Sequence, residues 1–371
     1  MTASDDPIQT YLAAWLRGAP LPLALPTDDA ALLLREAVDH GVVNLLADRL
    51  GEHPEAPPAF AEGLSALARH GLLSDLAREH ALRQVLDRSA AEGLDLLLVK
   101  GAHLAYSHYL RADLRPRTDT DLFVAQDQRA QADSVLTALG YTVMTQVTGD
   151  LVSSQAMYVL RSHGVVIHGI DLHWRIANPQ LFAEALGHEE LLHRSVLLPR
   201  LGAHARGLSD VDALMLACMH RVAHHYDSPR LIWLYDIHLL ASSLAPEDWP
   251  RLRALVRERS VSAVCHVGLS RAAAIFHTPL PPLLLSELAR DASESPEETA
   301  RYLGAPSRAV SLWQDLRHLS TWRARLRLLR EHLVPSSDYM RRVYAPNRRM
   351  PLLLLYIERV CVRAVTWFRR R

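Results

Sequence analysis

The sequence predicts an α+β protein in which a small domain with a mixed sheet is embedded between N-terminal helices and a C-terminal helical domain. Apolar residues recur at three- and four-residue steps through about the first 90 residues, as in amphipathic helices. The period changes at Leu94, where short apolar runs alternate with helical stretches, and helical periodicity returns from about Ser209. We therefore expect a helical region at 1–90, an α/β domain at 91–205 and a helical domain at 206–371.

The N-terminal helices are predicted by "ALLLREAVDHGVVNLLADRL" and "LLSDLAREHALRQVLDRSAAEG", with the proline-rich stretch 51–60 between them. In the α/β domain, "LDLLLVKG", "DTDLFVA" and "YTVMTQV" read as strands, and "AHLAYSHYL" and "QRAQADSVLTALG" as the helices between them. A hairpin is expected in "MYVLRSHGVVIHGIDLHWRI", turning at Ser162-His163-Gly164. The C-terminal helices should break at Pro279–Pro282, Ser293–Pro296 and Pro335.

The overall composition is that of an ordinary soluble globular protein, with 49% hydrophobic residues and a formal net charge of zero. Three widely separated cysteines offer neither metal spacing nor a disulfide framework. The acidic N-terminus is not a signal peptide, and the apolar run 351–357 is too short to span a bilayer. We expect a cytoplasmic protein.

The charge is unevenly distributed along the chain. Residues 301–371 hold 16 arginines against four acids, a balance of +12, so the rest of the chain carries −12. This asymmetry permits an anionic partner at the C-terminal end, although a solvated basic face is the commoner explanation.

The segment "DTDLFV" carries the first candidate site. The period of a strand puts Asp119 and Asp121 on one face, with Thr120 and Leu122 on the other. Two carboxylates on one face of a strand repel each other, so their presence needs an explanation. One explanation is an exposed edge strand, on which both acids face water. Because the flanking residues read as buried, we favour a divalent cation, and oxygen ligands select Mg²⁺ or Mn²⁺.

The second hairpin strand adds a third acid. In "GIDLHWR", Asp171 and His173 share a face, and Ile170 and Leu172 lie on the other. Three carboxylates from two strands could hold two metal ions about 4 Å apart, as two-metal phosphoryl or nucleotidyl transfer requires. One ion would bind a triphosphate, and the other would lower the pKa of an acceptor hydroxyl whose proton Asp171 receives.

These motifs together resemble a known family. Lys-Gly at 100–101, "RPRTDTDLFV", "DLHW", "MHRVAHHYDSPRLIWLYDIHLL" and "LVPSSDYMRRVY" resemble the bacterial uncharacterised nucleotidyltransferases, which belong to the polymerase-β-like superfamily. The resemblance implies that Asp119 and Asp121 are the metal-binding pair and Asp171 the third carboxylate. Lys100-Gly101 stands where the wider superfamily has Gly-Ser at the start of its nucleotide-binding helix.

The resemblance also suggests how phosphates are held. Lys100 is the only lysine of the chain, and an ammonium is not interchangeable with a guanidinium at a tight site. It would bind the phosphates together with backbone N–H groups at Gly101, and Arg115 and Arg117 are further candidates. For Lys100 the alternative is a side chain that extends to solvent from a strand end, and for the arginines a solvated loop.

A histidine cluster at 220–225 offers a competing interpretation. His220 and His224 lie four residues apart on one helical face, as zinc ligands do, but the glutamate of a metalloprotease motif is missing. A metal-dependent phosphohydrolase would need a His-Asp doublet, which is absent because His225 is followed by Tyr226. We expect the next helix to bury Leu231, Trp233 and Leu234. The resemblance then places His173, His224, Arg230 and Asp236 along the cleft.

Other enzyme classes lack their motifs. There is no phosphate-binding loop of the Gly-x-x-x-x-Gly-Lys-Ser/Thr type, no Gly-x-Ser-x-Gly elbow and no dinucleotide-binding Gly-x-Gly-x-x-Gly. The leading hypothesis is a magnesium-dependent nucleotidyltransferase that moves NMP from an NTP such as ATP to a hydroxyl or phosphate. The acceptor would be a small molecule or a peptide. A tRNA- or protein-modifying, toxin-like enzyme and an inactive nucleotide-binding adaptor remain alternatives.

Overall fold

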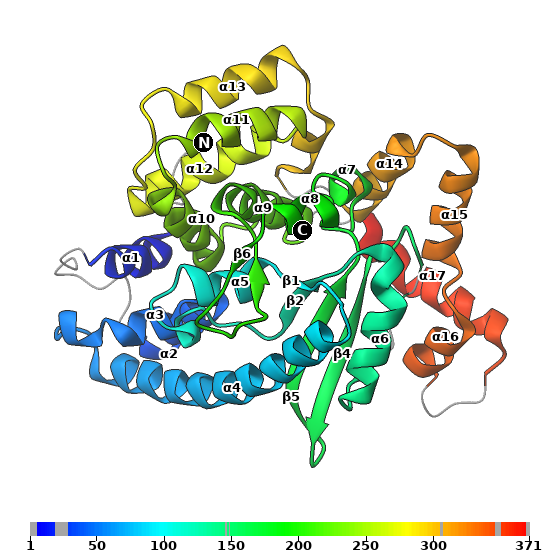
Figure 1. Cartoon of the computed structure of the whole chain (residues 1–371), viewed down its shortest axis with the longest axis horizontal. Coiled ribbons are helices and arrows are strands. Elements are labelled where there is room, and N and C mark those ends of the chain that lie inside the picture. The colour runs from blue at the N-terminus through cyan, green and yellow to red at the C-terminus, as the bar shows by residue number, and fades with distance from the viewer. Residues whose placement is uncertain are drawn as a thin grey trace.

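The computed structural model describes residues 6–18, 29–144, 147, 149–304, 307–345 and 350–368, with side chains up to residue 361. It has the expected α+β architecture, in which a mixed seven-stranded sheet lies among helices (Figure 1). None of the described helices is long and apolar enough to cross a membrane.

Four helices and a short 3₁₀ turn form the N-terminal part: α1 (Pro7–Leu16), α2 (Ala30–Asp39), α3 (Val43–Asp48), η1 (Leu50–Glu52) and α4 (Pro58–Ala91). The carboxylates of Asp6 and Asp29 cap α1 and α2 by accepting backbone N–H groups of the first turn. Pro58 begins α4 at a position where its missing N–H costs nothing. Helix α4 then runs across the molecule and contacts both β5 and α6 (Figure 1).

The sheet has the order β3-β4-β5-β2-β1-β7-β6. Its strands are β1 (Leu97–Leu98), β2 (Thr120–Phe123), β3 (Thr142–Val143), β4 (Gln155–Ser162), β5 (Val165–His173), β6 (Val196–Leu197) and β7 (Arg206–Gly207). The β5–β2 and β1–β7 pairs are parallel and the other pairs are antiparallel. The predicted hairpin is β4–β5, which turns where His163 and Gly164 both adopt positive φ.

The two helices predicted in the α/β part are present as α5 (Lys100–Ser107) and α6 (Arg129–Ala138). Four short helical elements were not predicted: η2 (Ala112–Leu114), η3 (Gln126–Gln128), α7 (Gln180–Ala183) and α8 (His188–His193). Two details of the strands also differ. Strand β3 is shorter than expected, with residues 145 and 146 of that segment outside the described part, and the two-residue strands β6 and β7 were not predicted.

The C-terminal part is helical from Asp210 onward. It comprises α9 (Asp210–Ala223), α10 (Leu231–Ser243), α11 (Asp248–Glu258), α12 (Ser262–Phe276), α13 (Leu284–Glu294), η4 (Glu298–Tyr302), α14 (Arg308–His318), α15 (Trp322–Leu333), α16 (Ser337–Tyr344) and α17 (Leu352–Phe368). The breaks predicted at Pro279–Pro282 and Pro335 fall between consecutive elements, and the one predicted at Ser293–Pro296 begins in the last two residues of α13.

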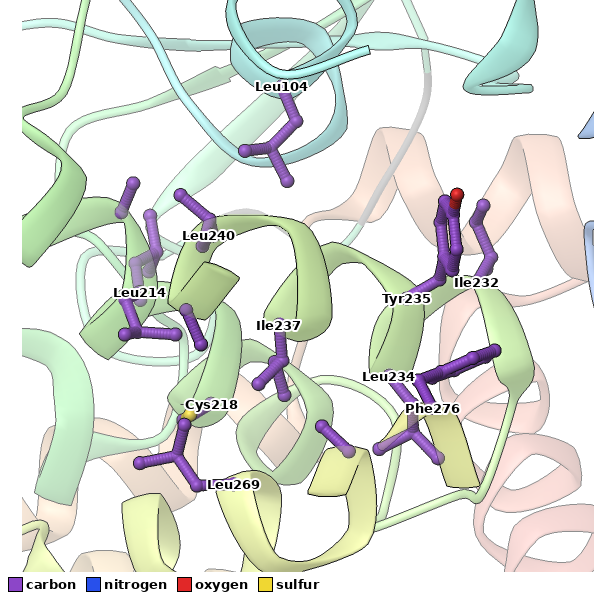
Figure 2. Packing of buried hydrophobic residues seen from close by; sticks show 14 of the residues in the cluster. Leu104, Leu214, Cys218, Ile232, Leu234, Tyr235, Ile237, Leu240, Leu269 and Phe276 are labelled. Carbon is purple, nitrogen blue, oxygen red and sulfur yellow. The ribbon is translucent and has the colours of Figure 1, made fainter. Parts of the chain in front are cut away.

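Two large apolar clusters support the site. One packs α9, α10 and α12 together and extends to Trp15 and Leu33 of the N-terminal helices (Figure 2). The other lies beneath the sheet and includes Leu98, Leu122 and Leu172. Each fully buried leucine or isoleucine contributes about 1.5–3 kcal/mol. Because one cluster contains residues from both helical parts, the N-terminal helices are anchored to the C-terminal ones. The domain limits drawn from the sequence stay a prediction.

The last helices are tied to the sheet by carboxylates. Glu331 of α15 accepts hydrogen bonds from the backbone N–H groups of Leu151 (2.9 Å) and Val152 (3.0 Å), in the loop before β4. Asp315 of α14 accepts the N–H of Gln180 at 2.8 Å. Carboxylates of α14 and α15 thus satisfy backbone N–H groups that are distant in the sequence. The bonds from Glu331 hold the loop that leads into β4.

Replacing Glu331 by alanine is expected to lower the protection of the Leu151 and Val152 amides against hydrogen exchange about tenfold or more. A charged acceptor of two N–H groups contributes about 1–3 kcal/mol. Asp338→Ala on α16 is the control, because its exposed carboxylate pairs with Arg342 and not with this loop. Equal protection of the two amides in wild type and Glu331→Ala would contradict the proposed role.

Candidate active site beside the β2–β5 strand pair

The register of two parallel strands brings the predicted carboxylates together. Asp121 of β2 pairs directly with Asp171 of β5. Their neighbours Thr120 and Ile170 are fully buried on the opposite face of the sheet, so the two acids share the other face. Asp119 lies just before β2 and lines the same cleft. The side chains predicted from two distant segments therefore meet at one place.

Lys100 lies among these acids. Its Nζ is 2.6 Å from Oδ1 of Asp121 and 3.1 Å from Nε2 of His173, and its side chain is only 6% exposed. The residue begins α5 with a φ of 54°, a left-handed conformation that costs a non-glycine residue about 1 kcal/mol. A strained backbone at a buried cation indicates a role beyond packing.

A further set of side chains holds Asp171 and His173 in place. His173 Nε2 lies 2.9 Å from Oδ1 of Asp121 and 3.4 Å from Oδ2 of Asp171. Gln155, at the start of β4, donates its amide to Oδ2 of Asp171 and accepts a 2.9 Å hydrogen bond from Asn178. Asn178 accepts in turn from the backbone N–H of Ser154. This chain of hydrogen bonds limits the rotation of the Asp171 carboxylate.

The acids differ in how readily they ionise. Burial and the neighbouring carboxylates of Asp121 and Asp171 raise the pKa of Asp119 to about 6, although Lys100 and His173 act to lower it. Burial would also raise the pKa of Asp121, but the Lys100 ammonium and the His173 imidazole hold it below its usual range. The pKa of His173 is raised: burial and Lys100 lower it, and hydrogen bonds to Asp121 and Asp171 outweigh them.

The donor set suits a cation. Ligand atoms of Asp121, Asp171 and His173 lie within 4.8 Å of one another. Oδ1 of Asp171 is buried and has no hydrogen-bond partner among the described residues, so it has an unused lone pair at the place where a cation would bind. Asp119 supplies a further carboxylate from the same cleft. Carboxylate oxygens suit Mg²⁺ and Mn²⁺, and an imidazole ligand suits Mn²⁺ or Zn²⁺ better than Mg²⁺.

The cleft has a volume of about 540 Å³, and a second group of side chains lines it: His220, His224, His225, Arg230 and Trp233. The ring of His224 lies 6.4 Å from the ring of His173, measured between centroids, so this group adjoins the acids. The ring of His225 stacks on Trp233 at 3.8 Å and lies 2.9 Å from His220, measured between their Nε2 atoms. Trp233 is partly buried and packs against the large apolar cluster of α9, α10 and α12, and it also lines the cleft, which was not expected.

Arg230 is the arginine of this group. Its guanidinium lies over the Trp233 ring and donates a long hydrogen bond to the carbonyl of Val38, and it forms no ion pair within the described residues. Its Nε is buried without a partner in the same part of the chain. Burial lowers the pKa of Arg230, and the nearby Arg115 lowers it further. These features favour binding of an anion.

Arg115 is engaged elsewhere. It is buried and forms a forked ion pair with Asp236, with Nε 2.8 Å from Oδ1 and Nη2 2.8 Å from Oδ2. Tyr109 donates to the same carboxylate at 2.7 Å. A Cβ on Gly101 would lie 3.1 Å from the Arg115 guanidinium, so the glycine makes room for this ion pair. Asp236 thus lies behind Arg115, one layer away from the main cleft.

Arg117 is also paired. Its Nη2 lies 2.8 Å from Oδ1 of Asp75 on α4 and 3.1 Å from the Tyr106 hydroxyl, and its side chain is only 3% exposed. Both arginines therefore join the wall of the cleft to neighbouring helices. Their expected role as phosphate ligands stays a prediction, and their guanidinium groups already have partners in this structure.

Four contributors were missed or undervalued by the sequence reasoning. Gln155 and Asn178 have no spacing relative to Asp171 that would identify them, because they reach it through cross-strand pairing and a loop. His173 was expected only to border the cleft, although its shared strand face with Asp171 was visible in the sequence. Trp233 resembled a core residue because it lies in an almost wholly apolar run.

Comparison with known proteins adds a family. The sequence matches the family described as uncharacterised nucleotidyltransferase over residues 26–277, about two-thirds of the chain. No curated protein matches the sequence.

Asp119→Asn is expected to stabilise the metal-free protein above pH 6. The folded-state pKa of Asp119 is above its ordinary value, so ionisation opposes folding and wild type loses stability as pH rises from about 4 to about 6. Asparagine avoids this loss, which should amount to about 1 kcal/mol after solvent screening, or about 2 °C in Tm. Thermal unfolding in EDTA from pH 4 to pH 8 measures it.

The matched control is Asp95→Asn, whose carboxylate is exposed just before β1. We expect this variant to follow the wild-type profile at every pH. If Asp119→Asn also follows the wild-type profile, ionisation of Asp119 does not oppose folding, and the repulsion among the acids that the geometry implies is absent.

Proposed function

Because the chain belongs to the family of uncharacterised nucleotidyltransferases, we propose that it transfers a nucleoside monophosphate from a nucleoside triphosphate to an acceptor hydroxyl or phosphate, with release of pyrophosphate. The observation that carries this proposal is the convergence of Asp119, Asp121 and Asp171 with Lys100 in a single cleft. A reaction that builds up and redistributes phosphate charge needs this combination of cation-binding acids and a fixed ammonium.

The carboxylates of Asp119, Asp121 and Asp171, with His173 beside them, would hold Mg²⁺ or Mn²⁺. A bound ion would neutralise phosphate charge and make an acceptor hydroxyl more acidic. Three carboxylates could hold two such ions, and ligand atoms of Asp121, Asp171 and His173 lie within 4.8 Å of one another. Gln155 would keep Asp171 oriented through the hydrogen bond to Oδ2 and leave Oδ1 for the reaction.

The remaining steps are assigned to residues of the chain. The acceptor oxygen forms a bond to the α-phosphorus while the bond from that phosphorus to the oxygen bridging to the β-phosphate breaks. Asp171 receives the proton of an acceptor hydroxyl, and pyrophosphate leaves with the electron pair of the broken bond. Positioning of the two reactants in the cleft supplies much of the rate enhancement.

We assign the phosphates to Lys100 and Arg230. Lys100 has the ammonium nearest the acids, and Arg230 is a partly buried cation without an ion pair among the described residues. Arg115 and Arg117 would act on the cleft indirectly, since their charges are paired with Asp236 and Asp75. The nucleobase and the acceptor would then lie toward Trp233 and the N-terminal helices, which supply Val38 and Asn44 to the lining.

The decisive experiment distinguishes which phosphate moves. The protein is incubated with Mg²⁺ or Mn²⁺ and each of the four NTPs, labelled at the α- or the γ-phosphate, with cell lysate, total tRNA and the protein itself as acceptors. We expect transfer of the α-label and a loss of about a thousandfold or more in Asp119→Asn. The same variant is expected to be at least as stable as wild type, so this loss would not reflect unfolding.

Other outcomes contradict specific parts of the proposal. Transfer of only the γ-label would make the protein a phosphotransferase. No transfer and no binding of metal–NTP by calorimetry would favour an inactive adaptor. α-Label that enters tRNA or protein would identify a nucleic-acid- or protein-modifying enzyme, whereas label in small molecules would indicate a metabolite or peptide acceptor.

A second prediction concerns Arg230. Arg230→Gln is expected to weaken binding of metal–NTP about tenfold, because a charge-assisted hydrogen bond to phosphate contributes about 1.5–3 kcal/mol. Calorimetry measures this against Arg251→Gln, which removes an exposed arginine of α11 far from the lining residues. Unchanged NTP binding with a raised KM for the acceptor would move Arg230 to the acceptor side of the cleft.

A further inference from the structure

One helix at the edge of the molecule carries apolar side chains on the face that points away from the protein. In α15, Trp322, Leu326, Leu329 and Leu333 recur at steps of four and three residues, so they lie along one face, which we call the apolar stripe. Trp322 is 68% exposed, Leu326 58% and Leu333 44%, whereas Leu329 is partly buried. Figure 1 shows α15 at the outer edge of the C-terminal helices.

The opposite face of α15 already binds the protein. Leu328 is buried, Glu331 accepts N–H groups from the loop before β4, and Arg327 forms an ion pair with Asp150 of that loop. These contacts fix the rotation of the helix about its axis. The apolar stripe is therefore held outward, and contacts with the described residues do not account for it.

Arginines flank the apolar stripe on both sides. At about 100° per residue, Arg323 and Arg330 lie roughly 70–90° to one side and Arg325 roughly 70° to the other, and all three are exposed. The one acid of the helix, Glu331, faces the protein. The surroundings are also basic, since residues 301–371 carry a balance of +12.

We infer that α15 binds an anionic lipid surface, with the apolar stripe in the boundary between headgroups and acyl chains. Tryptophan and leucine on one face with arginines beside them are the features of a helix that lies in this boundary, where the arginines reach lipid phosphates. A nucleic acid would contact the arginines and could stack a base on the tryptophan, but it would leave the row of leucines without an apolar partner. A second copy of the chain would bring two basic faces together.

This binding is peripheral and independent of the proposed reaction. Its effect would be to hold the enzyme at a surface, with the cleft residues unchanged. The association should weaken with salt, because much of the attraction is between arginines and phosphates.

Flotation of the full chain with lipid vesicles tests the inference. Vesicles of phosphatidylcholine alone are compared with vesicles that also contain phosphatidylglycerol, at low and high salt. We expect binding to the anionic vesicles that falls with salt and little binding to the neutral ones. Failure to bind anionic vesicles would overturn the inference.

A pair of variants locates the binding surface. Leu326→Asp is expected to weaken vesicle binding on the order of tenfold or more, because it places an anion within the stripe. The control, Leu73→Asp, changes another exposed helical leucine, 69% exposed on α4, and is expected to bind as wild type does. Circular dichroism melting checks that both variants fold, and Trp322→Ala provides a neutral change in the same stripe.

The remaining outcomes also decide the question. Equal binding by wild type and Leu326→Asp would show that the lipid contact is not on α15. A concentration-dependent dimer of wild type that Leu326→Asp abolishes, without any vesicle binding, would identify a second copy of the chain as the occupant.

Discussion

The parallel pairing of β2 with β5 is the constraint on which the site depends. It sets Asp121 directly beside Asp171, with Asp119 close by, and so concentrates negative charge on one face of the sheet. In the structure Lys100 and His173 offset part of this charge. The left-handed backbone of Lys100 and the hydrogen bond from Gln155 to Asp171 follow from the same need to hold charged groups at fixed positions.

A second layer of charge pairs joins the site to the helices around it. Arg115 binds Asp236 of α10, and Arg117 binds Asp75 of α4. Both arginines belong to the segment between α5 and β2, so this segment is fixed to a helix of the N-terminal part and to one of the C-terminal part. Buried ion pairs of this kind are costly to break, since removal of one partner leaves an uncompensated charge. The walls of the cleft are thereby set at a defined distance from the carboxylates.

Much of this was predictable from short-range patterns. The change of period at Leu94, the Asp-x-Asp spacing before a buried strand and the alternation around Asp171 each rest on neighbouring residues, and the structure has the corresponding strands. The partners of Arg115 and Arg117 were not predictable, because Asp236 and Asp75 are far away in the sequence and an arginine in a loop resembles a solvated one. Gln155 escaped notice for a related reason, since its link to Asp171 depends on the β4–β5 register. The roles assigned to these residues stay predictions.

The hydrogen bonds of Glu331 bear on how such a protein can be divided in evolution. Family similarity ends at residue 277, yet the carboxylate that satisfies the amides of Leu151 and Val152 comes from α15. That loop leads directly into Ser154 and Gln155, which orient Asp171. A recombination event that exchanged the chain after residue 277 would thus alter the support of this carboxylate without changing a single residue of the cleft. The segment that must be inherited together is longer than the segment that resembles its relatives.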